Sequence, residues 1–292
     1  MKDNNRNIVM KNLIVRTITG LLFVAAIVVS FFDPIAMTAL FALVTGLCMW
    51  EYSGLVNEME NVHVNRFIST VAGVYFFIAT MAFCSGTVSS ASIYIPYLLT
   101  VVYLFVSEIY ANTKNAVYDL AHTMLGQMYI ALPMSMINVL AFNVTVEGDV
   151  VYNSLLPLSV FIFLWANDTG AYCFGSLFGK HKLFPRISPA KSWEGSIGGA
   201  IVVLVAAWIL GIVDRNMGNM SGLTSVQWLG LGLVVVVFGT WGDLVESLFK
   251  RTLGIKDSGS ILPGHGGMLD RFDSSLMAMP AAVLYIYSLS FL

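Results

Sequence analysis

Residues able to do chemistry gather in two short stretches of an otherwise apolar chain. In "GDLVESLFKR", Asp243, Glu246 and Lys250 stand three and four residues apart, which places them on one face of a helix. The stretch "LPGHGGMLDRFD" combines three glycines with a histidine, an arginine and two aspartates. Glycines let backbone N–H groups approach phosphate oxygens, and carboxylates bind hard cations. Together these residue types are typical of a site for a metal-bound polyphosphate.

A segment of mixed charge connects the two stretches and includes the second of them. The chemistry-bearing side chains of "KRTLGIKDSGSILPGHGGMLDRFD" are Lys250, Arg251, Lys256, His265, Arg271, Asp257, Asp270 and Asp273. An isolated HGG would indicate only a tight turn. The prediction therefore depends on the combination of cations, acids and glycines.

A second polar loop, "GKHKLFPRISPAKSWEGS", has the same character. Lys191, Ser192 and Glu194 are expected to open a helix beside Gly195, where backbone donors and the helix dipole favour an anion. The alternative is that these cations only mark the cytoplasmic side or bind anionic lipid.

The composition defines the surroundings of these loops. The 292 residues are 57% hydrophobic and 11% charged, with a mean hydropathy of +0.78. The apolar residues come in blocks of about twenty, which span a hydrocarbon core of roughly 30 Å. The net charge of −2 and the lack of a long basic run give no support for a nucleic-acid partner. We predict an all-α, polytopic integral membrane protein.

About nine transmembrane helices are expected. They lie near residues 13–32, 34–50, 67–85, 92–108, 117–143, 153–176, 194–213, 226–248 and 274–292. The fifth contains Pro133 and the sixth is interrupted by "WANDTGAY", so both are expected to be kinked or partly unwound.

The basic residues predict the orientation. With the amino terminus in the cytoplasm, all but one of the 15 lysines and arginines fall on the cytoplasmic side, Arg215 being the exception. We expect a multi-pass protein of the cytoplasmic membrane whose polar loops face the cytoplasm. Residues 1–150, spans one to five, are interpreted as scaffold, and residues 151–292, spans six to nine, as the catalytic region.

Three acids fall inside expected spans: Asp168, Asp243 and Glu246. A charge at the centre of a membrane helix costs about 2.5–3.5 kcal/mol on insertion scales, so each predicts a functional role. An ion pair between Glu246 and Lys250 that only joins helices is an alternative, but it does not explain Asp243. An ion-coupled transporter is a further alternative, disfavoured by the many phosphate ligands on one side.

The polar segments resemble the signature of the phosphatidate cytidylyltransferases, also called CDP-diacylglycerol synthases: S-x-apolar-K-R, then K-D, then P-G-H-G-G-x-x-D-R-x-D. The matching positions are Ser247, Lys250, Arg251, Lys256, Asp257, Pro263, Gly264, His265, Gly266, Gly267, Asp270, Arg271 and Asp273. Upstream, "NDTGAY" and "SPAKSWEG" are also similar to family segments, with Ala190 as a small departure. The resemblance covers roughly residues 165–273, and the first half is matched only in general character.

The resemblance implies an enzyme that forms CDP-diacylglycerol and pyrophosphate from CTP and phosphatidic acid with Mg²⁺. It implies metal ligation by Asp243 and Asp270, with Lys250, Arg271 and His265 as further catalytic residues. Substrate binding is expected at Lys191, Ser192, Glu194, Asp168, Glu246, Ser247, Arg251, Lys256, Asp257, Gly264, Gly266, Gly267 and Asp273. His265 is not assigned as an obligatory base, because a phosphatidate phosphate is already largely ionised near neutral pH.

The expected partners are CTP, phosphatidic acid and the bilayer. A second, monovalent cation and a homodimer are left open by the sequence. A CTP-dependent lipid kinase is the nearest rival, distinguished by its product. A CDP-alcohol phosphotransferase is disfavoured, since its D-G-x-x-A-R…G…D…D motif is not found.

Overall fold

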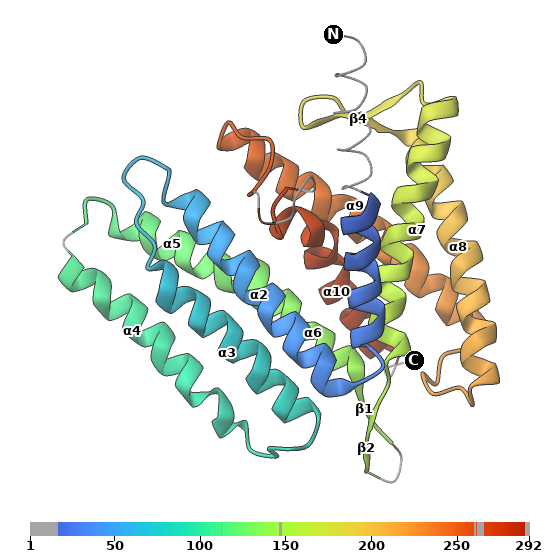
Figure 1. The fold of residues 1–292 in the computed structure, drawn as a ribbon, viewed down its shortest axis with the longest axis horizontal. Coiled ribbons are helices and arrows are strands. Elements are labelled where there is room, and N and C mark those ends of the chain that lie inside the picture. The colour runs from blue at the N-terminus through green and yellow to red at the C-terminus, as the bar shows by residue number, and fades with distance from the viewer. Residues whose placement is uncertain (1–16, 112, 146–147, 260, 262–265, 290–292) are drawn as a thin grey trace.

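The computed structural model describes residues 17–111, 113–145, 148–259, 261 and 266–289. These residues form a helical bundle with two small hairpins (Figure 1). After a helix at Thr17–Ser30, the elements are α2 (Pro34–Val56), α3 (Arg66–Cys84), η1 (Ala91–Tyr94), α4 (Ile95–Ala111), α5 (Ala116–Gly126), η2 (Gln127–Ala131), α6 (Leu132–Ala141), β1 (Phe142–Val144), β2 (Val150–Tyr152), α7 (Leu155–Phe178), β3 (Lys182–Phe184), β4 (Ser188–Ser192), α8 (Trp193–Asn216), α9 (Ser225–Thr252) and α10 (Leu269–Leu289).

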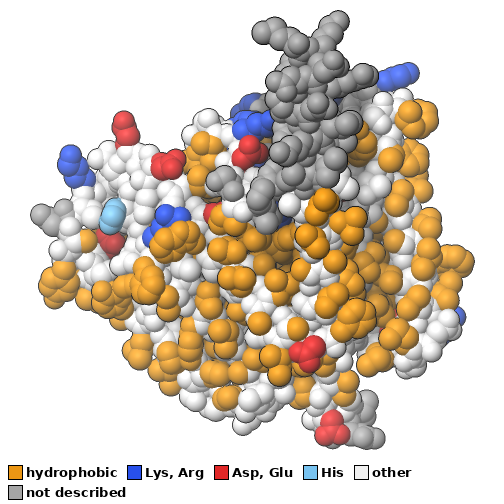
Figure 2. Space-filling model, viewed as in Figure 1, with side chains coloured by type: hydrophobic (Ala, Val, Ile, Leu, Met, Phe, Trp, Pro, Cys, Tyr) orange, Lys and Arg blue, Asp and Glu red, His pale blue; other side chains and the backbone are white. Residues whose placement is uncertain are grey.

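The helices are those of a multi-pass membrane protein. Among the described residues, seven helical segments are long and apolar enough to cross a bilayer, and the helix Thr17–Ser30 is shorter. Apolar side chains cover the middle of the molecular face in Figure 2, whereas most lysines and arginines of that face lie near one end. Such a surface is suited to lipid. The all-α class is confirmed, and the count of nine spans stays a prediction.

The irregularity expected in the fifth span is confirmed. Between α5 and α6, Gln127–Ala131 forms a π-helical turn, two residues before Pro133. Proline removes one backbone donor and crowds the preceding turn, and a wider turn relieves that crowding. The Gln127 side chain donates to the Ser69 carbonyl at 2.8 Å, which ties the turn to α3.

The interruption expected in the sixth span is wrong, because α7 runs without a break from Leu155 to Phe178. Thr169 Oγ1 donates back to the Trp165 carbonyl at 2.8 Å, so this polar side chain is satisfied within the helix. The helix also packs closely on α8, since a Cβ on Gly170 would lie 2.9 Å from the Gly199 Cα. The polar residues of "WANDTGAY" therefore lie on a regular helix and do not interrupt its backbone hydrogen bonds.

Helices α9 and α10 cross where the acidic residues lie. A Cβ on Gly242 would come within 2.6 Å of the Asp273 carbonyl oxygen, so only glycine allows this approach. The buried Phe272 ring contacts Phe41 of α2 and Phe161 of α7, with centroids 6.1 and 6.0 Å apart. The start of α10 is thereby packed against both halves of the chain. The division into two regions near residue 150 stays a prediction.

Candidate functional site

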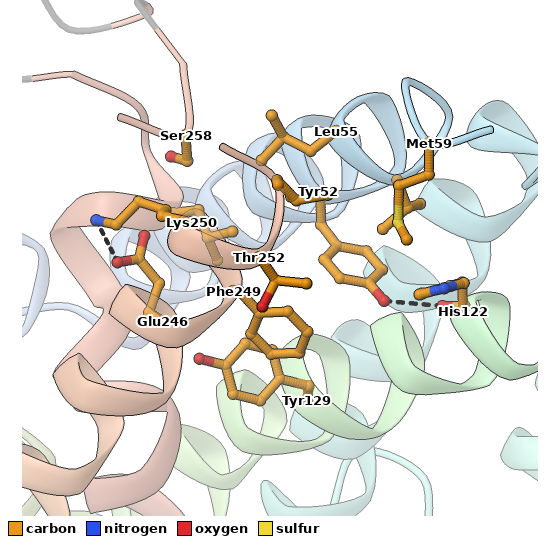
Figure 3. A pocket seen from close by; sticks show the side chains of 13 residues that line it. Tyr52, Leu55, Met59, His122, Tyr129, Glu246, Phe249, Lys250, Thr252 and Ser258 are labelled. Atoms are coloured by element: carbon orange, nitrogen blue, oxygen red, sulfur yellow. Dashed lines mark hydrogen bonds and ion pairs between the residues drawn. The ribbon is translucent and has the colours of Figure 1, made fainter. Parts of the chain in front are cut away.

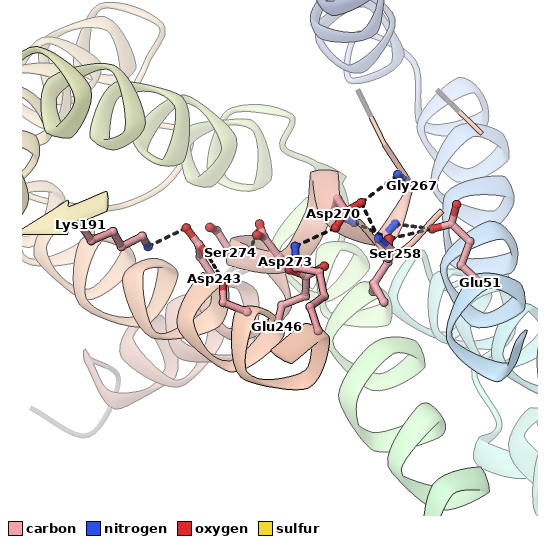
Figure 4. A network of polar contacts seen from close by, with 12 residues as sticks. Glu51, Lys191, Asp243, Glu246, Ser258, Gly267, Asp270, Asp273 and Ser274 are labelled. Carbon is pink, nitrogen blue, oxygen red and sulfur yellow. Dashed lines mark hydrogen bonds and ion pairs between the residues drawn. The ribbon is translucent and has the colours of Figure 1, made fainter. Parts of the chain in front are cut away.

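A row of polar side chains crosses one end of the bundle. Figure 4 shows it running from Lys191 on β4, past Asp243 and Asp273, to Asp270 and finally Glu51 on α2. The row joins the two polar loops that the sequence singled out. The polar loop that contains Lys191 reaches this row through the contact of Lys191 with Asp243 of α9.

The Lys191 end of the row contains an ion pair. Lys191 Nζ lies 2.6 Å from Asp243 Oδ2, and both side chains are partly exposed. Ser247, one helical turn after Asp243, donates its hydroxyl to Asp243 Oδ1 at 3.1 Å. Since each carboxylate oxygen accepts more than one contact, Asp243 retains capacity for a cation or a ligand.

More acids surround this pair. The carboxylates of Asp168 and Asp273 each interact electrostatically with Asp243. The positive charges of Lys191 and Arg271 attract the Asp168 carboxylate. Three carboxylates near one another repel unless cations balance them, which makes the cluster suited to a positively charged partner.

A groove opens beside the Lys191–Asp243 pair. Its lining includes Asn167 and Asp168 of α7, Lys191 and Ser192 of β4, and Thr240 of α9. Ser192 caps α8 by accepting the N–H of Gly195 at 3.2 Å, as the sequence predicted for this helix start. The groove therefore joins a cation, a helix amino terminus and a carboxylate.

Lys250 occupies the middle of the row between two acids. Its Nζ pairs with Glu246 and lies 2.8 Å from Asp270 Oδ1. The ion pair considered as an alternative is thus present. It is extended by Asp270, so Lys250 also joins α9 to α10.

Asp270 organises the described part of the glycine loop around its own carboxylate. Its Oδ2 accepts the backbone N–H groups of Ser258 at 2.8 Å and Gly267 at 2.9 Å. Gly266 has φ +83°, and a Cβ there would lie 2.7 Å from Asp270 Oδ2. These glycines allow the chain to wrap tightly around the carboxylate.

Other predicted residues lie apart from these contacts. Glu194 accepts the N–H groups of Lys180 and His181 at 3.2 Å and contacts His181 Nδ1 at 2.6 Å, so it holds the β3–β4 hairpin. Three further predicted residues are exposed: Arg251, Lys256 and Asp257. Arg271 is also exposed, but its charge acts on Asp168 in the acidic cluster. Gly264 and His265 lie outside the described residues.

The carboxylates fit Mg²⁺ as a chemical donor set. No group of three or more His, Cys, Asp or Glu side chains that could hold a metal ion is found within the described ranges. Mg²⁺ in phosphate-processing sites needs no such group, because one or two carboxylates, waters and substrate phosphates complete its octahedral shell. Asp243 and Asp270, on facing helices, suit that mode.

Sequence reasoning missed Glu51. This residue of α2 is 6% exposed and its carboxylate accepts the N–H groups of Met268 and Leu269 at 2.9 and 2.8 Å. The predicted second span ended at residue 50, whereas α2 extends to Val56. If the predicted span had been longer, Glu51 would have fallen inside it. It would then have been predicted to have a functional role, as Asp168 was.

A separate small pocket lies between α2, α5 and α9. Figure 3 shows Tyr52, Tyr129 and Phe249 facing it, with Glu246 and Lys250 at one side. Its walls are mainly aliphatic and aromatic, so they are poorly suited to a triphosphate. The groove beside Lys191 is the better candidate for a charged ligand.

We expect Lys191→Ala to lower turnover at least about tenfold, because a charged contact contributes about 1.5–3 kcal/mol. Lys114→Ala, which removes an exposed lysine between α4 and α5, is the matched control and should leave turnover nearly unchanged. Steady-state rates of the two purified variants, with equal elution volumes from size-exclusion chromatography, provide the comparison. Near-normal turnover of Lys191→Ala would contradict a role in substrate binding and favour the alternative that this lysine only marks the cytoplasmic side.

Comparisons with known proteins bear on the whole chain. The sequence model of the cytidylyltransferase family matches residues 12–289. A phosphatidate cytidylyltransferase of Staphylococcus aureus (strain COL) is 53% identical over 124 residues, which is 42% of this chain and 45% of that protein. One of Haemophilus influenzae is 47% identical over 132 residues, 45% of this chain and 46% of that protein. The matched segment thus spans about half the length of these relatives.

Fold and site together define a multi-pass membrane protein with a polar, cation-balanced site at one end of its helices. The family match covers nearly all of the sequence. The chain belongs to the cytidylyltransferase family.

Proposed function

We propose that this protein is a phosphatidate cytidylyltransferase, which joins CTP and phosphatidic acid into CDP-diacylglycerol and releases pyrophosphate. The observation that carries the proposal is the Lys191–Asp243 contact, which joins the polar loop that contains Lys191 to the acidic face of α9 beside a groove for a charged ligand. Both substrates are anions and one is a lipid. A groove at the end of membrane helices, lined by Lys191 and by a carboxylate that a bridging cation could neutralise, suits that pair.

The reaction is a substitution at phosphorus. A phosphate oxygen of phosphatidic acid forms a bond to the α-phosphorus of CTP, and the bond from that phosphorus to the bridging oxygen breaks, so pyrophosphate leaves with the electron pair. No covalent enzyme intermediate is needed. The protein's part is to hold two anions in line and to balance their charge.

The residues divide this task. Lys191 and Arg271 offer positive charge near the acidic cluster, and the amino terminus of α8 offers backbone donors to a phosphate. Asp243 and Asp270 would hold Mg²⁺, which when bound neutralises and aligns phosphate oxygens. Lys250 keeps the Asp270 carboxylate beside α9 through its 2.8 Å contact. A second, monovalent cation and a homodimer remain predictions.

The orientation belongs to the same proposal. The site faces the cytoplasm, where CTP is present, and this agrees with the distribution of lysines and arginines. A cysteine introduced at Arg186, which is exposed between β3 and β4, should react with a membrane-impermeant maleimide only from the cytoplasmic side. Labelling from the outer side would contradict the orientation.

Product analysis tests the function. The protein, purified in detergent, is incubated with phosphatidic acid, Mg²⁺ and CTP carrying label in both the cytidine and the γ-phosphate. We expect the cytidine label in the lipid fraction and one pyrophosphate released for each CDP-lipid formed. Transfer of the γ-phosphate to lipid with release of CDP would indicate the kinase instead, and no lipid product of either kind would contradict the proposal.

A further inference from the structure

Within the polar row, Glu51 contacts the residues that are farthest from it in the sequence. Its two carboxylate oxygens accept separate backbone N–H groups, Oε1 from Met268 at 2.9 Å and Oε2 from Leu269 at 2.8 Å. The Ser258 hydroxyl also contacts Oε2, at 3.4 Å. One buried carboxylate on α2 therefore meets two segments of the loop that precedes α10.

The contacts replace a local helix cap. Leu269 is the first residue of α10, so its N–H and that of Met268 have no partner within the helix. Such donors are usually satisfied by a Ser, Thr, Asp or Asn directly before the helix, and a negative charge there is favoured by the helix dipole. Here the carboxylate comes from another helix, more than two hundred residues away along the chain.

Glu51 and Asp270 share one hydrogen-bonded unit. Ser258 donates its N–H to Asp270 Oδ2 at 2.8 Å, and its hydroxyl lies between Glu51 Oε2 and the Asp270 N–H, at 3.4 and 3.3 Å. Two glycines leave room for this unit. A Cβ on Gly259 or Gly267 would come within 2.6 Å of a Glu51 carboxylate oxygen.

We propose that Glu51 is a positioning residue, which fixes the start of α10 against α2 and thereby sets the direction of the Asp270 carboxylate. Asp270 is the next residue after the pair that Glu51 caps, so a shift of that cap moves Asp270 relative to Lys250 and α9. Glu51 itself contacts the loop backbone and acts through Asp270. The catalytic consequence rests on the proposed function, whereas the geometric part does not.

The geometric part is tested by hydrogen exchange. Glu51→Gln keeps the size of the side chain but replaces one of the two acceptor oxygens with an NH₂ group, which then faces one of the two backbone N–H groups. We expect the amides of residues 266–270 to exchange at least about tenfold faster in this variant, because a hydrogen bond to a charged group is lost. Glu58→Gln, an exposed glutamate just after α2, is the matched control and should exchange like the wild type. Unchanged exchange in Glu51→Gln would overturn the inference, whatever the activity.

The catalytic part is tested by kinetics on the same preparations. In Glu51→Gln we expect kcat to fall at least about tenfold and the half-saturating Mg²⁺ concentration to rise, with a smaller change in KM for CTP, because a displaced Asp270 ligates less well. Ser258→Ala, which removes the shared hydroxyl, should change the same parameters in the same direction. A lower melting temperature with unchanged Mg²⁺ dependence would show that Glu51 only caps α10 and does not position Asp270. An inactive wild type would contradict the proposed function, and the exchange experiment would still decide the geometry.

Discussion

Asp243→Asn should lower turnover by at least about two orders of magnitude, the scale expected when a main electrostatic element of catalysis is removed. Asparagine keeps the shape of the side chain and can still accept the Ser247 hydroxyl, so the change removes the charge and replaces the oxygen that faces Lys191 with an NH₂ group. Only a small loss of stability is expected, because the pair with Lys191 is partly exposed and such pairs contribute about 0–1 kcal/mol. Initial rates over a Mg²⁺ titration and the melting temperature in detergent measure both effects.

A double variant separates a catalytic Asp243 from one that only pairs with Lys191. If the pair merely balanced two charges, Asp243→Asn combined with Lys191→Met would recover most of the activity lost by either change alone. We expect the double variant to be at least as inactive as Asp243→Asn. Asp149→Asn, an exposed aspartate at the β1–β2 hairpin, is the control for the loss of one carboxylate. Full activity of Asp243→Asn at limiting Mg²⁺ would redirect the search for a metal ligand to Glu246 and Asp168.

Local features of the site could be predicted from the sequence because they depend on neighbouring residues. Helical spacing places Glu246 and Lys250 one turn apart, and the structure pairs them. Ser192 precedes the apolar run of α8 and caps that helix. Pro133 predicts an irregular span, and a π-helical turn precedes it. Each of these predictions uses at most one helical turn of sequence.

Features that depend on distant contacts could not be predicted in this way. The sequence does not indicate which cation faces which acid, so the pairing of Lys191 with Asp243 and of Lys250 with Asp270 emerges only from the packing of the helices. The contacts of Glu51 depend on packing in the same way, because its partners belong to the other half of the chain.

The continuous α7 illustrates a different limit. Polar residues in an apolar run predict either a broken helix or a polar face, and periodicity alone does not decide between them. The structure has an unbroken α7 that packs closely on α8 where Gly170 approaches Gly199, so the polar residues form a face of the helix. Asp168 consequently points into the groove from a regular helix.

The two acids assigned to Mg²⁺ differ in their surroundings. Within the described part of the chain, Asp243 forms hydrogen bonds and ion pairs with side chains only, those of Lys191 and Ser247. Asp270 accepts two backbone N–H groups besides Lys250. Removing charge should therefore affect catalysis at both positions and stability mainly at Asp270.

Asp270→Asn should lower turnover by at least about two orders of magnitude and also destabilise the fold by about 1.5–3 kcal/mol, the contribution of hydrogen bonds to a charged group. The reason is geometric: the two N–H groups meet Oδ2 and Lys250 meets Oδ1, whereas an asparagine offers one acceptor oxygen and turns an NH₂ group toward the other donors. The loss should appear as a lower melting temperature and as faster amide exchange at Ser258 and Gly267.

The comparison with Asp243→Asn makes this prediction specific. Equal inactivity of the two variants, with a lowered melting temperature only in Asp270→Asn, is the expected pattern. If Asp270→Asn were inactive but as stable as the wild type, the backbone contacts of its carboxylate would contribute little to the fold. If it were destabilised but kept near-normal turnover per folded molecule, Asp270 would be a structural anchor of the loop, and ligation of Mg²⁺ would have to depend on Asp243 with another acid of the cluster, Asp168 or Asp273.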